Sequence, residues 1–162
     1  MHSIVVANGE LFDRLNIEQA CRGLAPVDFE GFSRWLELQG ANPKFYIPGE
    51  ASTISAAILR NNQWRIKYPS RPYPGQRSPV EGTVLEVLLA KKSQSGMLQG
   101  FETIIFAGTG DEYAKVLEDV LAFELELVVV ARADLLSPGL RRLLRHPLAQ
   151  FCDLRSDLGV AV

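Results

Sequence analysis

The sequence predicts a three-layer α/β/α fold, in which helices cover both faces of a mainly parallel central sheet. Two observations support this prediction. The first is that several apolar runs have only the length of strands, and the second is that longer stretches, whose apolar residues recur at helical spacing, separate these runs. Short apolar strands separated by helices are typical of a parallel sheet that is buried on both faces. A chain of 162 residues, 47% of them hydrophobic, is long enough to build a core, and we expect one domain over residues 1–162.

The first half of the chain opens with a strand and then alternates helices with strands. The apolar run Ile4-Val5-Val6-Ala7 ends at Asn8-Gly9, a pair that favours a turn. Asp28 is a favourable helix cap, and Gly23 and Gly40 are favourable helix ends. The expected elements are a strand at 4–7, helices at 11–23 and 28–40, a strand at 44–47, a helix at 51–61 and a strand at 64–68.

A proline-rich loop separates the two halves of the chain. Residues 69–79 contain four prolines in eleven positions, which excludes a regular helix or strand there. Later, Gly108-Thr109-Gly110 is expected to form the turn between a buried strand and a helix. The expected elements are a helix at 80–92, a polar connector at 93–100, a strand at 101–107, a helix at 111–122, a strand at 125–131, a short basic helix at 138–145 and a strand at 151–154.

Acidic residues gather at one edge of the expected sheet. Because ligands of such sheets bind at the carboxyl ends of the strands, three places matter most: the loops after Val6 and Phe106, and the start of the helix at Val80. Carboxylate oxygens are ligands that Mg²⁺ and Mn²⁺ prefer, and such an ion polarises a phosphodiester and activates water. The acids at these places are Glu10, Glu81, Glu86, Asp111 and Glu112.

These segments resemble the NYN branch of the PIN-like nucleases over nearly the whole chain. The matching segments are Ile4 to Phe12, Val80-Glu81 with Glu86, Phe106 to Tyr113, Val128-Val129-Val130, Ser137-Pro138-Gly139-Leu140-Arg141 and Phe151-Cys152-Asp153-Leu154. The resemblance implies a PIN/NYN-like fold and a ribonuclease that depends on Mg or Mn. It implies Glu10, Glu81 and Asp111 as catalytic residues, with Glu86 and Glu112 joining them as metal ligands.

The sequence departs from this family at several acidic positions. Ala7 stands where the family has its first Asp, and Glu10 stands where the family has Asn. Glu81 replaces the Asp at the head of the apolar helix, and Ala149 takes the place of the late Asp before the final strand. Since a metal-dependent nuclease needs several converging carboxylates, these changes favour a degenerate member of the family.

The acids that remain have two interpretations. In the glycine turn, an ungapped match places Gly110 and Glu112 on the two family acids, whereas a one-residue deletion keeps Asp111. Asp111 and Glu81 also stand at the starts of helices, where a carboxylate accepts hydrogen bonds from free N–H groups. Helix capping is therefore the alternative to a metal site.

Basic and aromatic residues form two candidate RNA-binding groups, one in residues 64–77 and one in the basic helix near residue 140. Aromatic rings stack on unpaired bases and cations contact phosphates, so a loop rich in both is typical of single-strand recognition. The alternative is that the cations are only solvated. The candidate RNA-binding residues are Arg65, Lys67, Arg71, Tyr73, Arg77, Arg141, Arg142 and Arg145.

Three functions follow from these observations. The leading one is a degenerate NYN/PIN-like domain that binds RNA or a protein partner with little or no cleavage. The alternatives are an active Mg- or Mn-dependent ribonuclease and a structural or homo-oligomeric interaction module that binds no nucleic acid. No cofactor is expected unless the site is active. The net charge of −2 excludes none of these partners.

The location of the protein follows from what the sequence lacks. No signal peptide is recognisable, and the longest apolar run near the C-terminus, at residues 125–131, has the length of a strand. We therefore expect a cytoplasmic protein without a membrane partner. Two cysteines, Cys21 and Cys152, are expected to be buried, reduced thiols.

Overall fold

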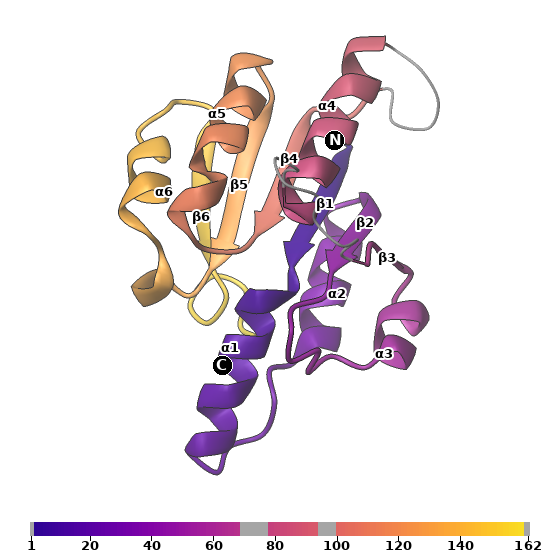
Figure 1. Ribbon diagram of the computed structural model, residues 1–162, viewed down its shortest axis with the longest axis vertical. Coiled ribbons are helices and arrows are strands. Elements are labelled where there is room, and N and C mark those ends of the chain that lie inside the picture. Colours follow the sequence, from indigo (N-terminus) through magenta and orange to yellow (C-terminus); the bar gives the residue numbers. More distant parts are fainter. Residues whose placement is uncertain (1, 69–77, 94–99, 161–162) are drawn as a thin grey trace.

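The computed structural model describes residues 2–68, 78–93 and 100–160, and its central feature is one parallel sheet of six strands (Figure 1). The strands lie in the order β3-β2-β1-β4-β5-β6, and every neighbouring pair is parallel. They are β1 (Ser3–Asn8), β2 (Ala41–Ile47), β3 (Trp64–Ile66), β4 (Thr103–Ala107), β5 (Glu126–Ala131) and β6 (Ala149–Asp153). The predicted three-layer α/β/α fold with a parallel sheet is confirmed.

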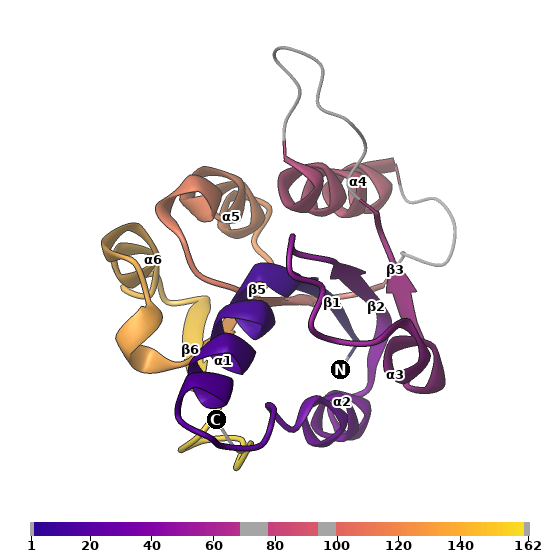
Figure 2. The same ribbon diagram turned by 60° about the horizontal axis from the view of Figure 1, so that its bottom comes forward.

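Within the described residues, three helices cover each face of the sheet (Figure 2). They are α1 (Gly9–Cys21), α2 (Phe29–Leu38) and α3 (Ala56–Asn61) on one face, and α4 (Pro79–Ser93), α5 (Ala114–Ala122) and α6 (Pro138–Leu143) on the other. Two short 3₁₀ helices, η2 (Asp111–Tyr113) and η3 (Ala133–Leu135), follow β4 and β5.

The core divides in two because side chains of a strand alternate between the faces of a sheet. Along β1, Ile4 and Val6 pack under α4 to α6, whereas Val5 and Ala7 pack under α1 to α3. All four side chains are fully buried. This double burial explains why the strands appear in the sequence as continuous apolar runs.

The strand order places a topological switch point between β1 and β4. The first half of the chain adds β2 and β3 on one side of β1, and the second half adds β4, β5 and β6 on the other side. In the register of the sheet, Val6 of β1 faces Phe45 of β2 and Phe106 of β4. The chain leaves β1 and β4 toward opposite faces of the sheet, and in doubly wound sheets ligands bind in the crevice at such a switch point, at the carboxyl edge.

Most helix boundaries lie within two residues of the sequence-based expectation, and two helices differ by more. The helix expected at 51–61 begins at Ala56, capped by Ser55, because the preceding segment is a loop held by Asp13. Asp13 is buried and accepts hydrogen bonds from the N–H groups of Ser52 (3.2 Å) and Thr53 (2.8 Å) and from the Thr53 hydroxyl (2.7 Å). The helix expected at 111–122 is divided into η2 and α5.

The expectation of two buried thiols was wrong for one of the cysteines. Cys21, the last residue of α1, is exposed, and Cys152 in β6 is half-buried. Burial and the nearby charge of Asp157 raise the pKa of the Cys152 thiol. Both cysteines are free.

Candidate functional site

The crevice between β1 and β4 is built around a buried hydrogen bond between Asn8 and Tyr113. Asn8 ends β1 and caps α1, because its Oδ1 accepts a hydrogen bond from the Glu10 N–H (3.2 Å). The other side-chain atom of Asn8, Nδ2, donates to the Tyr113 hydroxyl (3.1 Å). Asn8 is thus fixed at both ends, and the Tyr113 hydroxyl keeps its own proton for donation to a further acceptor.

A glycine determines how the chain enters η2. Gly110 has φ of 116°, a conformation that side chains disfavour, and it precedes η2 directly. A Cβ at this position would lie 2.6 Å from Glu112 Oε2. Gly110 therefore permits both the turn and the close approach of the Glu112 carboxylate.

Three of the five predicted metal ligands act on the Tyr113 hydroxyl. Burial is the largest cause that raises the pKa of Tyr113 to about 12, and the negative charges of Glu10, Glu112 and Glu81 raise it further, against the hydrogen bond from Asn8. These glutamates come from three separate parts of the chain, as the sequence analysis expected. Tyr113 is consequently protonated at neutral pH and surrounded by carboxylates.

Asp111 is turned away from this group. Its Oδ1 accepts a hydrogen bond from the N–H of Gly139 at 2.6 Å, in the first turn of α6. A Cβ on Gly139 would lie 2.5 Å from the same oxygen, so the glycine allows this contact. The interpretation that Asp111 caps the helix it begins was wrong, because η2 has no side-chain cap and Asp111 binds α6 instead.

Glu81 takes part in a reciprocal cap at the start of α4. The Ser78 hydroxyl accepts a hydrogen bond from the Glu81 N–H (3.2 Å) and donates one to Glu81 Oε1 (3.2 Å). A serine followed three residues later by a glutamate is a common arrangement at helix starts. Ser78 is therefore the residue that caps an N–H group of α4, and the Glu81 carboxylate supports this cap by accepting from the Ser78 hydroxyl, not from an N–H group as the capping interpretation held.

Glu86 and the basic residues of the first group lie at the β3 edge. Lys67 Nζ is 3.3 Å from Glu86 Oε2, and both side chains are exposed. Lys67 and Arg65 also stack over the Phe45 ring, at 5.4 and 5.9 Å from its centroid. Three further residues predicted to bind RNA lie outside the described residues: Arg71, Tyr73 and Arg77.

The three arginines of the second basic group, Arg141, Arg142 and Arg145, differ in their contacts. Arg141 donates from Nε to the Leu136 carbonyl (3.1 Å) and from Nη2 to the Ala133 carbonyl (3.2 Å), so its side chain holds the loop before α6. Arg142 and Arg145 are exposed and line a shallow pocket of about 620 Å³ between α5 and α6.

The donor set of the crevice does not form a metal cage. Among the residues that the structure describes, no three His, Cys, Asp or Glu side chains are arranged so that they could hold a metal ion. The reason is local: Asp111 binds α6, and β1 ends in Ala7, buried on the α1 side, and Asn8, an amide.

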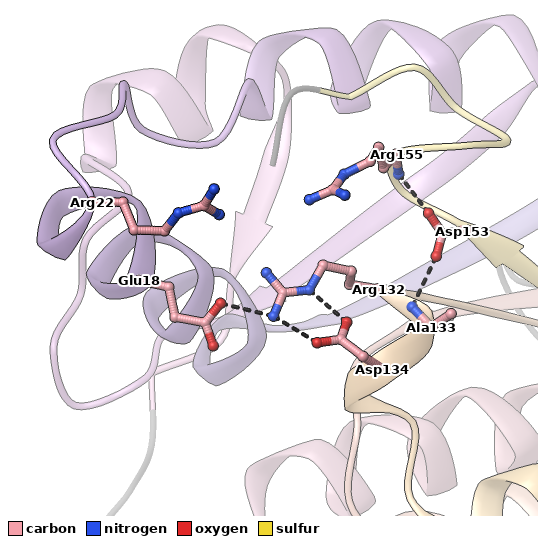
Figure 3. Close-up of a pocket in the computed structure, with 7 residues that line it drawn as sticks. All are labelled: Glu18, Arg22, Arg132, Ala133, Asp134, Asp153 and Arg155. Carbon is pink, nitrogen blue, oxygen red and sulfur yellow. Dashed lines mark hydrogen bonds and ion pairs between the residues drawn. The ribbon is translucent and has the colours of Figure 1, made fainter.

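A second polar site, missed by the sequence analysis, lies at the carboxyl ends of β5 and β6. It is a pocket of about 470 Å³ in which Arg22, Arg132 and Arg155 meet Glu18, Asp134 and Asp153 (Figure 3). One signal was available: Arg132 directly follows the apolar run of β5, so the rule applied to the ends of β1 and β4 also covered this position.

Comparisons with known proteins place the fold but not the function. No protein-family model matches the chain, and no curated protein matches it. The structure is similar to the crystal structure of VPA0982, a protein of unknown function from Vibrio parahaemolyticus RIMD 2210633. The TM-score is 0.63 at 11% sequence identity, over 96% of this chain and 94% of the other. At this identity the likeness extends to the fold alone.

A helix that crosses a membrane is long and predominantly apolar. In residues 2–68, 78–93 and 100–160, no helix is long and apolar enough to cross a bilayer.

Proposed function

We propose that this chain is a PIN/NYN-like domain that binds RNA without efficient cleavage. One observation carries the proposal: the Asn8–Tyr113 hydrogen bond occupies the switch point, where the family resemblance requires metal-binding carboxylates. The Asn8 Nδ2 group and the protonated Tyr113 phenol are donors and offer no anionic oxygen to Mg²⁺ or Mn²⁺, and Asn8 Oδ1 is engaged by the Glu10 N–H.

The direction of the Asp111 carboxylate supports the same proposal. A carboxylate that accepts a 2.6 Å hydrogen bond from Gly139 is oriented toward α6 and away from Tyr113. Metal sites lose function when a ligand is displaced by a fraction of an ångström, because the whole ligand set must converge on one ion. Because Glu81 is likewise hydrogen-bonded to Ser78, two of the three carboxylates that the resemblance implies as catalytic are held by the protein itself.

Several features of the described surface suit RNA. Arg65 and Lys67 present cations at the β3 edge, and Arg142 in α6 and Arg145 just after it present cations at the other end of the sheet. Cations of this kind contact the phosphates of a single strand, and the affinity of such contacts depends on salt.

Salt-dependent binding of a labelled single-stranded RNA tests the proposal. Fluorescence anisotropy with the full chain should give an affinity that falls as salt rises, because phosphate contacts release counterions. The double variant Arg65→Gln/Lys67→Gln should lower the slope of log affinity against log salt by roughly 1.4, at about 0.7 per lost contact. The exposed Arg34 on α2 offers a matched control, and Arg34→Gln should leave the slope unchanged.

Two outcomes would replace this proposal. If no RNA binds even at low salt, the chain is better explained as an interaction module, and sedimentation would then test whether it forms oligomers. If a Mn²⁺ titration gives stoichiometric binding that both Glu81→Gln and Asp111→Asn abolish, the active ribonuclease becomes the better account.

A further inference from the structure

We propose that Arg22, Arg132 and Arg155 form a pocket that binds a terminal phosphate, and that its natural source is an RNA end. The pocket of about 470 Å³ opens at the carboxyl ends of β5 and β6, beside the C-terminal half of α1. The identity of the ligand as RNA rests on the function proposed above, whereas the phosphate chemistry rests on the pocket itself.

Arg132 lies at the base of the pocket, and its side chain is held in place by Asp134 and Glu18. Its side chain is only 15% exposed, and two of its nitrogens are committed: Nε binds Asp134 at 2.6 Å, and Nη2 binds Asp134 at 3.0 Å and Glu18 at 2.7 Å. The hydrogen bond to Asp134 is the largest cause of a raised Arg132 pKa. The third nitrogen, Nη1, bonds to no residue that the structure describes.

The other two arginines approach from different elements. Figure 3 shows the guanidinium groups of Arg22 and Arg155 pointing toward each other across the pocket, with Arg132 beneath them. Arg22 extends from the end of α1 and forms no ion pair with the described part of the chain. Arg155 follows β6, and its main-chain N–H donates to Asp153 (2.8 Å).

The three carboxylates of the pocket already have donors of their own. Glu18 and Asp134 lie together on the side of Arg132 opposite Nη1 (Figure 3). Asp153 accepts from the N–H groups of Ala133 (2.8 Å), Arg155 (2.8 Å) and Ser156 (3.0 Å). Although partial burial of Asp153 opposes it, these backbone hydrogen bonds lower the pKa of its carboxyl.

Three guanidinium groups face one space (Figure 3). Acids and arginines are equal in number, but Glu18 and Asp134 lie below Arg132, on the side away from the other two guanidinium groups. A planar guanidinium donates paired hydrogen bonds to phosphate oxygens. A terminal phosphate carries a charge of about −1.5 to −2, against about −1 for a diester, and therefore gains more from several cations.

The surface next to the pocket indicates why the phosphate is terminal. A groove of about 420 Å³ continues along α1, and its charged lining is acidic apart from Arg14: Glu10, Asp13, Glu18 and Glu50. A continuing phosphodiester backbone would be repelled there. Glu10 and Glu18 are eight residues apart on α1, so the pocket lies roughly 12 Å along the helix from the Tyr113 crevice.

The test compares RNA oligonucleotides that differ only at one end. Anisotropy with RNA labelled at the opposite end should show that a 5′- or 3′-phosphate strengthens binding about tenfold over a hydroxyl end, the gain expected of charge-assisted hydrogen bonds. The double variant Arg22→Gln/Arg155→Gln should lose this preference and keep the wild-type melting temperature within about 2 °C, because both side chains are at the surface. Arg34→Gln is the control and should retain the preference.

The outcomes separate the two proposals. RNA binding with equal affinity for phosphate and hydroxyl ends, or a preference that persists in the double variant, would overturn the pocket and leave the proposed function standing. If the wild type binds no RNA, a titration with inorganic phosphate tests the pocket by itself. Shifts of the arginine side-chain NMR signals in the wild type but not in the double variant would support a phosphate pocket without RNA. No shift in the wild type would overturn it.

Discussion

Replacement of Asp111 distinguishes a structural carboxylate from a catalytic one. In the structure, Asp111 Oδ1 accepts a 2.6 Å hydrogen bond from Gly139 N–H and so ties η2 to α6. A hydrogen bond to a charged group contributes about 1.5–3 kcal/mol, and the exposure of Asp111 favours the lower end. Asp111→Ala should therefore destabilise the protein by about 1.5 kcal/mol, which lowers Tm by roughly 3–6 °C in a domain of this size.

Differential scanning calorimetry of three variants measures this effect. Asp111→Asn keeps an acceptor oxygen and should lose about half as much stability. Glu112→Ala, at the neighbouring position, forms no hydrogen bond that ties η2 to α6 and should stay within about 0.5 kcal/mol of the wild type. The reasoning is refuted if Asp111→Ala is as stable as the wild type and loses Mn²⁺ binding instead.

Four other substitutions test the environment of the crevice and of the core. Since the pKa of Tyr113 is raised from 10.0 to about 12, the stabilisation from its protonated form is complete below pH 10 and disappears as the pH rises to about 12. Urea denaturation across this range should show a steeper loss of stability in the wild type than in Tyr113→Phe, and equal slopes would disprove this. Ultraviolet titration of Glu10→Gln should show a lower Tyr113 pKa than in the wild type, and an unchanged pKa would disprove that effect of Glu10. Gly110→Ala places a Cβ on a residue with φ of 116° and 2.6 Å from Glu112 Oε2. It should lower the free energy of unfolding by about 1–3 kcal/mol in thermal denaturation. An unchanged stability would show that a side chain does not strain this turn. Lys44 is buried, and burial lowers its pKa against the opposing effect of Glu37, whose Oε1 lies 3.6 Å from Lys44 Nζ. At that distance Nζ has an ion-pair partner but no hydrogen bond to offset its burial. Lys44→Met should therefore leave Tm unchanged or raise it, and a clear fall in Tm would contradict this.

The sequence predicted the fold well because its signals are local. The apolar run of β1 can be recognised without knowledge of the rest of the chain, and Asn8-Gly9 marks its end, although α1 begins there directly and no turn intervenes. The start of α3 was missed because it depends on Asp13, whose hydrogen bonds to Thr53 span forty residues. A pattern-based reading cannot detect that a distant carboxylate holds a segment in a loop.

The candidate site was predictable in its location but not in its geometry. The sheet topology alone brings the ends of β1 and β4 together, and with them Glu10 and Glu112. The orientation of Asp111 depends on Gly139, twenty-eight residues later, which no spacing rule reveals. The arginine pocket likewise combines α1 with the ends of β5 and β6. The NYN/PIN-like family, and RNA as the partner, remain predictions.

Single-turnover cleavage of bound RNA tests the central claim most directly. A 5′-labelled single-stranded RNA would be incubated with excess protein and millimolar Mn²⁺, with anisotropy to follow binding and a denaturing gel to follow chain length. We predict that the RNA is bound and remains as intact as in a protein-free control. RNA that is cut by the wild type, and spared by both Glu10→Gln and Glu81→Gln, would contradict the account and identify an active metal-dependent ribonuclease.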